Sequence, residues 1–312
     1  MKISLLESLN VSESYIHQLA QPLIDKGHEF TYYPEKTSDE DELYRRAKDA
    51  HVVMIANNPL PNSVIERLET TELINIAFTG TDHVDAVLCE KKGIKIMNAA
   101  GYAVTAVSEL AIGLAISLYR NIPQGDSEIR LGQEFPGKFQ GAQLKNKIVG
   151  IIGTGEIGLE TAKLFKAFGC QLIGYNRTQK LDAQALGMTY HSIEEVMALS
   201  DIISVHLPLT DQTHHLISGE LIDLMKPDAI ILNLARGPVI DNRALAQALH
   251  DGLIGGAGLD VFDCEPPLSN SDIFFDTPHT ILTPHIGYLT NESMEHRAQI
   301  VFDNIQKYIE SK

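Results

Sequence analysis

Three side chains that could together form a catalytic site follow apolar runs in the second half of the chain: Arg236, Glu265 and His285. An arginine at such a position can hold a carboxylate through two parallel hydrogen bonds. A histidine beside a carboxylate forms an acid/base pair, because the carboxylate fixes the ring tautomer and raises the pKa of the ring. Each residue alone also has an ordinary structural explanation, as a loop anchor or a packed ring. Together they predict a site that binds a carboxylate and transfers a proton.

A glycine-rich turn precedes these residues in the chain. The apolar run 148–152 leads directly into Gly153, Gly155 and Gly158, and a helical pattern follows at once. In this context the first glycine permits a tight turn, the second lets a pyrophosphate approach the backbone, and the third lets the helix lie close to the strand. The helix N-terminus adds N–H donors for the phosphates. The alternative is a turn without a ligand, but the context favours a dinucleotide site.

The residues after the next apolar run bear on which dinucleotide binds. An NAD-preferring site places a carboxylate there, about 20 residues beyond the first glycine, to accept a hydrogen bond from the ribose 2′-hydroxyl. This chain has Asn176, Arg177 and Thr178 instead. Arg177 can pair with a 2′-phosphate, although a solvated surface arginine is the alternative interpretation. The sequence therefore favours NADP(H), with NAD(H) possible.

Composition narrows the class of protein. The 312 residues carry a net charge of −16, which argues against a nucleic-acid partner and against binding to an anionic membrane. The three cysteines, Cys89, Cys170 and Cys264, have no disulfide-framework or zinc-site spacing, and three unpaired thiols fit a reducing cytoplasm. The chain begins in a strand-like run without a leader pattern. We therefore expect a cytoplasmic protein.

Short apolar runs alternate with helical patterns in two blocks, which predicts parallel sheets with helices on both faces. The stretch 124–143 lacks a period and is interpreted as a connector with one more helix. The fold class predicted is α/β, with two doubly wound parallel-sheet domains. The predicted strands are 3–6, 29–33, 52–56, 73–77 and 94–97, then 148–152, 171–175, 202–205, 229–232, 255–259 and 280–282.

The order of the motifs resembles the D-isomer-specific 2-hydroxyacid dehydrogenase family over nearly the whole chain, and the glyoxylate and hydroxypyruvate reductases in particular. The pattern 265–267 is a variant of the family's Glu-x-Pro. The crossover 98–101 lacks a proline that is frequent in the family. The segments that carry the resemblance are 79–85, 98–101, 107–109, 153–158, 206–210, 235–237, 258–262, 265–267 and 284–287.

The resemblance implies two domains, a substrate domain of flavodoxin-like type (1–99 and 287–312) and a Rossmann cofactor domain (100–286). Arg236 would bind the substrate carboxylate, His285 would be the general acid, and Glu265 would pair with His285. Asp260 would bind the nicotinamide carboxamide. No metal is expected, because Arg236 takes the polarising role. The remaining cofactor-binding residues implied are Gly153, Gly155, Glu156, Ile157, Gly158, Asn176, Arg177, Thr178, His206, Pro208, Thr213 and Ala235. The substrate-binding residues are Asn57, Asn58, Thr79, Gly80 and Tyr102.

The function implied is hydride transfer between NAD(P)H and a small 2-oxo acid, by a homodimer paired through the helix that contains 110–118. A different class of function, a dinucleotide-sensing interaction protein without turnover, stays open because the same fold occurs in corepressors. A formate- or phosphite-oxidising relative is a third interpretation, since one sequence does not define the size of the anion pocket.

Overall fold

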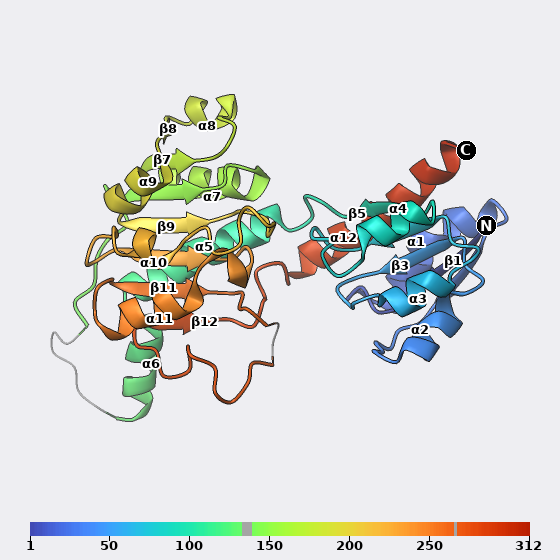
Figure 1. The fold of residues 1–312 in the computed structure, drawn as a ribbon, viewed down its shortest axis with the longest axis horizontal. Helices are drawn as coiled ribbons and strands as arrows, with labels where there is room; N and C mark the ends of the chain where they lie inside the picture. The colour runs from blue at the N-terminus through green and yellow to red at the C-terminus, as the bar shows by residue number, and fades with distance from the viewer. Residues whose placement is uncertain (133–138, 265–266) are drawn as a thin grey trace. The chain divides into compact units, whose positions relative to one another are not determined.

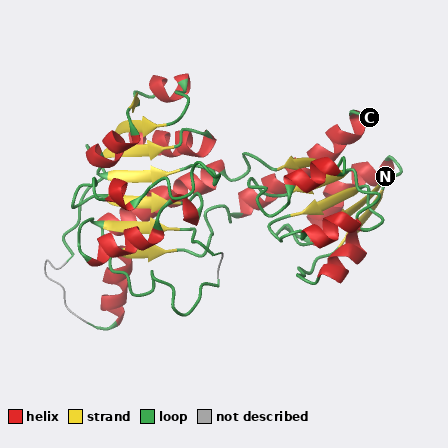
Figure 2. Cartoon of the chain, in the orientation of Figure 1, coloured by secondary structure: helices red, strands yellow, loops and turns green. Residues whose placement is uncertain are grey.

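The computed structural model describes residues 1–132, 139–264 and 267–312. The chain forms two compact units. The smaller unit contains residues 1–103 and 289–312, and the larger unit contains residues 104–288. Each unit is a parallel sheet with helices on both faces (Figures 1 and 2). This confirms the predicted fold class.

The smaller unit has a five-stranded parallel sheet in the order β2-β1-β3-β4-β5. Its central strands are buried on both faces, which explains their unbroken apolar sequences. Helices α1 and α12 pack together on one face, while α2, α3 and α4 form the other layer (Figure 1). The strands are β1 (Lys2–Leu5), β2 (Glu29–Tyr32), β3 (Val52–Ile55), β4 (Leu73–Ile76) and β5 (Lys95–Asn98). The helices are α1 (Glu13–Asp25), α2 (Glu40–Ala47), α3 (Asn62–Arg67), α4 (Ala86–Lys91) and α12 (Asn291–Glu310).

The larger unit has a seven-stranded parallel sheet in the order β12-β11-β10-β9-β6-β7-β8. The chain order reverses next to β6, and in such sheets ligands bind at the carboxyl ends of the strands near that point. The strands are β6 (Ile148–Ile152), β7 (Gln171–Tyr175), β8 (Thr189–Tyr190), β9 (Ile202–Val205), β10 (Ile230–Asn233), β11 (Gly256–Leu259) and β12 (Thr280–Leu282).

Two helical layers cover this second sheet. Helices α5 and α7 pack against each other and against the sheet on one face, and α9, α10 and α11 bury a large apolar cluster on the other. The helices are α5 (Val104–Tyr119), α6 (Ile122–Arg130), α7 (Glu156–Ala167), α8 (Leu181–Ala185), α9 (Ile193–Leu199), α10 (Gly219–Ile222) and α11 (Asn242–His250), with the 3₁₀ turn η1 (Gly237–Val239).

All eleven strands expected from the sequence are present to within two residues at each end. Strand β8 was not predicted, because its two residues are too few to show a periodicity. The region interpreted as a connector contains most of α6, and part of it (133–138) lies outside the described residues. Within the described parts of the chain, no helix combines the length and apolar character needed to cross a bilayer.

Candidate active site

The predicted site residues of the larger unit follow one row of aligned residues across the sheet. Neighbouring strands lie about 4.8 Å apart, so the loops that leave this row are brought together at the carboxyl edge. One to three residues after it come the glycine turn, Asn176, His206, Arg236, Asp260 and His285. The row consists of Tyr175, Ile152, Val205, Asn233, Leu259 and Leu282.

The glycine turn between β6 and α7 has room for a ligand. Gly153 has φ +97°, and a Cβ there would come within 2.6 Å of the His206 carbonyl oxygen. At Gly158 a Cβ would lie 2.0 Å from the Gly153 carbonyl oxygen, so both positions need glycine. A Cβ on Gly155 would meet no atom within 4 Å. The backbone is therefore open to an incoming group only at the middle glycine, as a bound pyrophosphate requires.

The first turn of α7 is held in place from behind. Ser108 of α5 donates through Oγ to the Ile157 carbonyl at 3.2 Å, and Thr161 Oγ1 donates to Ser108 Oγ at 3.1 Å. No side chain caps the N-terminus of α7 at Gly155. The orphan N–H groups of this turn, which includes Glu156 and Ile157, therefore suit the phosphates of a dinucleotide.

The loop after β7 presents a cation to solvent. Asn176 Nδ2 donates to the Thr178 carbonyl at 2.6 Å, which tightens the turn around Arg177. Arg177 is exposed, and its Nη1 donates to Gln212 Oε1 at 3.2 Å. A neutral partner leaves the guanidinium charge uncompensated, so Arg177 is available to an anionic group.

The segment after β9 forms a turn that is stabilised by hydrogen bonds between its own residues. Thr213 Oγ1 donates to the Pro208 carbonyl at 2.6 Å and accepts from the Thr210 N–H at 2.8 Å. This segment supplies two of the predicted cofactor residues, Pro208 and Thr213, and also Gln212, the partner of Arg177.

His206 begins the same segment, and its Nε2 lies 2.8 Å from Ser204 Oγ. Burial lowers the pKa of His206 to about 4, although part of the side chain still reaches solvent. The ring is therefore neutral at physiological pH, and a polar, uncharged surface faces the edge of the sheet. Such a ring can contact a cofactor without adding charge.

The shift of His206 makes stability depend on pH. Between pH 6.5 and about 4 the unfolded chain binds a proton at this residue that the native chain lacks. The free energy of unfolding therefore decreases as the pH is lowered through that window. We expect His206→Gln to remove on the order of 2 kcal/mol of this acid-dependent loss. Urea unfolding of both proteins at pH 8, 6 and 4.5 measures it. If the free energy of unfolding changed with pH by the same amount in both proteins, the lowered pKa of His206 would be contradicted.

The loop that carries Arg236 is fixed by a buried asparagine. Asn233, at the end of β10, has no exposed surface. Its Oδ1 accepts from the Ala235 N–H at 3.1 Å, and its Nδ2 donates to the Arg236 carbonyl at 3.0 Å. Arg236 Nη1 donates to the Ala235 carbonyl at 2.8 Å. Gly237 follows because a Cβ there would lie 2.0 Å from the backbone of Phe262.

His285 is held by a buried carboxylate. Asp260, 1% exposed, accepts through Oδ1 from Thr283 Oγ1 (2.6 Å) and the Ile286 N–H (2.9 Å), and through Oδ2 from the Gly287 N–H (2.7 Å). His285 therefore sits in a clamped turn with φ +54°, a conformation uncommon for a residue with a side chain. Burial raises the pKa of Asp260, and these hydrogen bonds oppose the rise.

The ring of His285 packs edge-on against Tyr288, with centroids 5.3 Å apart and an interplanar angle of 89°. His285 is partly exposed. Glu265, its predicted partner, lies outside the described residues. The nearby Asp263 accepts from Asn242 Nδ2 at 2.6 Å, which ties this loop to α11.

The smaller unit brings its predicted residues to one sheet edge in the same way. The loops with Asn57, with Thr79 and with Tyr102 follow β3, β4 and β5, whose last residues are aligned. Asn98 Nδ2 donates to the Thr79 carbonyl at 2.7 Å. Thr79 is exposed and Gly80 is partly exposed. Tyr102 is only 4% exposed and lies against Phe78.

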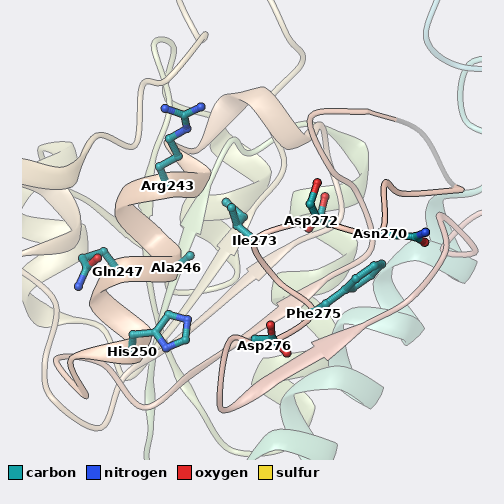
Figure 3. A pocket seen from close by; sticks show the side chains of 10 residues that line it. Arg243, Ala246, Gln247, His250, Asn270, Asp272, Ile273, Phe275 and Asp276 are labelled. Carbon is teal, nitrogen blue, oxygen red and sulfur yellow. The ribbon is translucent and has the colours of Figure 1, made fainter.

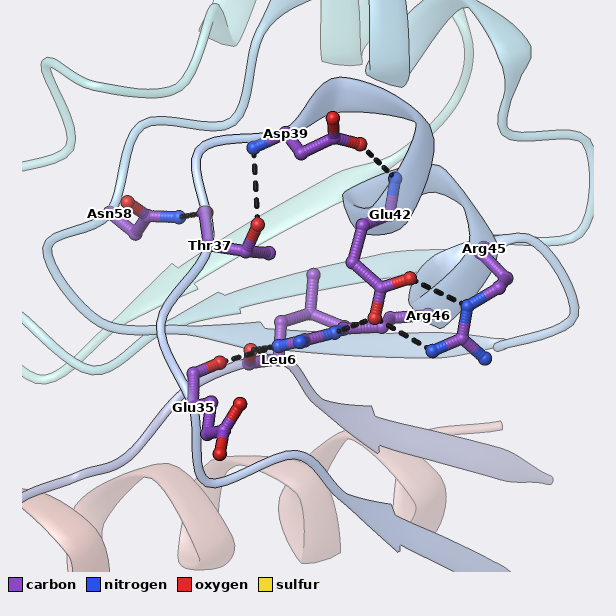
Figure 4. A network of polar contacts seen from close by, with 8 residues as sticks. All are labelled: Leu6, Glu35, Thr37, Asp39, Glu42, Arg45, Arg46 and Asn58. Atoms are coloured by element: carbon purple, nitrogen blue, oxygen red, sulfur yellow. Dashed lines mark hydrogen bonds and ion pairs between the residues drawn. The ribbon is translucent and has the colours of Figure 1, made fainter.

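Glu7, a buried carboxylate that was not predicted from the sequence, shapes the loop after β3. Its Oε1 accepts from the N–H groups of Ala56 (2.8 Å) and Asn58 (3.1 Å). Asn58 is 4% exposed and donates through Nδ2 to the Thr37 carbonyl at 2.6 Å, so its side chain is used in the fold, whereas Asn57 is exposed. Arg46 links the segment after β1 to the segment before α2, because its Nη1 donates to the carbonyls of Leu6 and Glu35 (Figure 4).

A separate pocket of about 620 Å³ lies on the flank of the larger unit, and Figure 3 shows α11 on one side of it and the segment 270–276 on the other. It contains none of the predicted site residues. Over the described residues, no group of three or more His, Cys, Asp and Glu side chains could hold a metal ion.

Comparison with known proteins agrees with this geometry. Residues 112–287 match the model for the D-isomer specific 2-hydroxyacid dehydrogenase, NAD binding domain. The chain is 37% identical over 268 residues to a glyoxylate reductase of Thermococcus litoralis, covering 83% of this chain and 80% of that one. It is 38% identical over 272 residues to a D-3-phosphoglycerate dehydrogenase of Methanocaldococcus jannaschii, covering 86% of this chain but only 52% of that relative's length.

Among solved structures, an acyclic imino acid reductase in complex with NADPH and D-Arg has a TM-score of 0.90 at 26% identity. The match covers 100% of this chain and 98% of that one. The smaller and larger units are thus both represented in the same solved chain.

Proposed function

Because the chain belongs to the D-isomer-specific 2-hydroxyacid dehydrogenase family, it is a nicotinamide-dependent oxidoreductase, and we propose that it works as an NADPH-preferring reductase of small 2-oxo acids. The observation that carries the proposal is the shared sheet edge, where the loops of Arg236 and His285 leave the same row as the glycine turn. The relatives named above are enzymes, which supports turnover over a purely sensing role.

The residues divide the chemistry among them. NAD(P)H supplies the hydride when bound. Arg236 binds the substrate carboxylate and polarises the carbonyl with a charge that Asn233 holds in place. His285 donates a proton to the carbonyl oxygen, and Glu265 is the predicted partner of its ring. Asp260 fixes the His285 turn, and its second oxygen has a lone pair left for a carboxamide.

The two units take different parts in this proposal. The larger unit holds the dinucleotide through the glycine turn, the 176–178 loop and the segment after β9. The smaller unit binds the substrate, with the backbone at Thr79 and Gly80 holding the carboxylate and Asn57 and Tyr102 contributing to side-chain selection. The name of the Thermococcus relative points to glyoxylate as the first substrate to test, and the resemblance noted from the sequence adds hydroxypyruvate.

The NADPH preference rests on Arg177. In Arg177→Ala we expect the KM for NADPH to rise about 10- to 100-fold, the value of a charge-assisted hydrogen bond, while the KM for NADH stays within about twofold. Initial rates with each cofactor and with glyoxylate, hydroxypyruvate, pyruvate and a branched 2-oxo acid measure it. Lys163→Ala removes an exposed cation of α7 that pairs with Glu160 and is the matched control. A wild-type preference for NADH would overturn the proposal for the cofactor but leave the reductase.

We further propose a homodimer. The exposed apolar side chains of α6 and its C-terminus support it: Ile122 is 50% exposed, Ile129 68% and Leu131 70%. Helix α6 has no buried residue of its own, so these apolar side chains are available for contact with a second copy of the chain. The cysteines Cys89, Cys170 and Cys264 are all free, which supports a reducing compartment such as the cytoplasm.

A further inference from the structure

A tyrosine hydroxyl joins the glycine turn to the loop after β7. Tyr190, in β8, lies opposite Gly174 of β7. Its Oη lies 2.8 Å from Thr154 Oγ1 and accepts a hydrogen bond from the Lys180 N–H at 3.0 Å. Since a lone pair of the hydroxyl takes the Lys180 N–H, its proton is available for Thr154. The hydroxyl thus has a partner on each of two separate segments.

These two segments are the ones that the proposed cofactor contacts. Thr154 lies between Gly153 and Gly155 and is 2% exposed, so this end of the link is buried in the phosphate-binding turn. Lys180 closes the loop that begins at Asn176 and presents Arg177. The first segment would meet the pyrophosphate and the second the 2′-phosphate. The spacing between those groups is limited by the cofactor's covalent structure, so affinity depends on the spacing of the loops.

The position of β8 also brings the tyrosine close. Gly174 has no side chain, and a Cβ there would lie 2.5 Å from Met188 Sδ. The glycine therefore lets the chain before β8 pack directly on β7. His191, which follows Tyr190, donates its backbone N–H to the Gly174 carbonyl at 3.0 Å, so the backbone on the far side of the tyrosine is also fixed.

We propose that Tyr190 is a positioning residue that sets the distance between the phosphate-binding turn and Arg177, and thereby determines discrimination between NADPH and NADH. The inference rests on the proposed function and adds a determinant for the same cofactor site. In this proposal Tyr190 acts on the cofactor through Thr154 and Lys180. Its loss should therefore weaken the 2′-phosphate interaction more than the interactions that both cofactors share.

Calorimetric titration of the purified full-length protein with NADPH, NADH and adenosine 2′,5′-bisphosphate tests this without turnover. In Tyr190→Phe, which keeps the ring, we expect the Kd for NADPH and for the bisphosphate to rise about five- to tenfold, and the Kd for NADH to change less than twofold. Thr154→Val should reproduce this loss, and Thr154→Ser, which keeps a hydroxyl, should restore wild-type selectivity. The double variant Tyr190→Phe/Thr154→Val should be no worse than either single variant, because both remove one link.

The outcomes separate the inference from the proposed function. If the wild-type protein binds NADPH and NADH equally, the cofactor preference itself is wrong and the inference falls with it. If the wild type prefers NADPH and Tyr190→Phe keeps the full preference, only the inference is overturned. An equal loss for both cofactors, together with a lower melting temperature, would also overturn it by showing a merely structural role.

Discussion

Replacing His285 with glutamine should reduce kcat for reduction of a 2-oxo acid by about 10³-fold, within the usual contribution of a positioned acid or base. The amide keeps the size and hydrogen-bonding ability of the ring but does not deliver a proton. The Kd for NADPH should change less than twofold, because the glycine turn and the Arg177 loop are untouched. Stopped-flow measurement of NADPH oxidation in a single turnover gives the rate of the chemical step directly.

The chain offers a matched control for this substitution. His279 also has positive φ (+55°, against +54° for His285), and it is exposed. His279 precedes β12 and His285 follows β12, so the two histidines lie at opposite ends of this strand. His279→Gln carries the same backbone cost and should keep wild-type turnover. Retention of more than a tenth of the wild-type rate in His285→Gln would remove His285 from its assigned role.

The strands could be predicted because parallel strands buried on both faces give continuous apolar runs. The predicted site residues then follow from topology, since the carboxyl ends of parallel strands meet at one edge. Arg236 and His285 were predicted in this way, and each lies three residues beyond the end of a strand, whereas Asp260 was predicted from the family resemblance. Short elements could not be predicted in this way. Strand β8, which contains Tyr190, has only two residues and shows no pattern.

Side-chain partners could not be predicted from the sequence, because they depend on contacts between distant segments. Asp260 was predicted as a cofactor contact, and the structure adds that its oxygens accept three hydrogen bonds from residues 283–287. Asn58 was predicted as a substrate contact, and the structure adds that its Nδ2 donates to the Thr37 carbonyl. The one signal available in the sequence was a polar residue at the end of a buried strand. Asn233 is such a residue, and its side chain binds the backbone of the loop that follows.

Glu7 illustrates the same limit in the smaller unit. A glutamate just after a buried strand is compatible with a solvated loop, yet it is 3% exposed and binds two backbone N–H groups near Asn58. Burial raises its pKa, while Lys36 and Arg297 act in the opposite direction through their charge. Arg297 is itself 2% exposed and donates to the Leu9 carbonyl at 2.7 Å. Only the tertiary fold brings residues 7 and 297 close enough to interact.

The second large effect is expected for Arg236→Lys, which keeps the charge but removes the planar fork. A lysine ammonium cannot hold a carboxylate bidentately while also bonding to the Ala235 carbonyl, so one of the two interactions is lost. We expect kcat/KM for the 2-oxo acid to fall about 100-fold, corresponding to about 3 kcal/mol for a charge-assisted hydrogen bond. The Kd for NADPH should stay within about twofold.

Arg243→Lys is the control, because Arg243 is an exposed arginine of α11 that lines the pocket in Figure 3 and is not among the predicted site residues. Asn233→Ala should act in the same direction as Arg236→Lys but more weakly, since it frees the loop without removing the guanidinium. If Arg236→Lys raised the Kd for NADPH as much as it lowered kcat/KM, Arg236 would be a cofactor residue. If neither changed, the carboxylate would be held elsewhere, and the backbone at Thr79 and Gly80 would then have to bind it without an arginine from the larger unit.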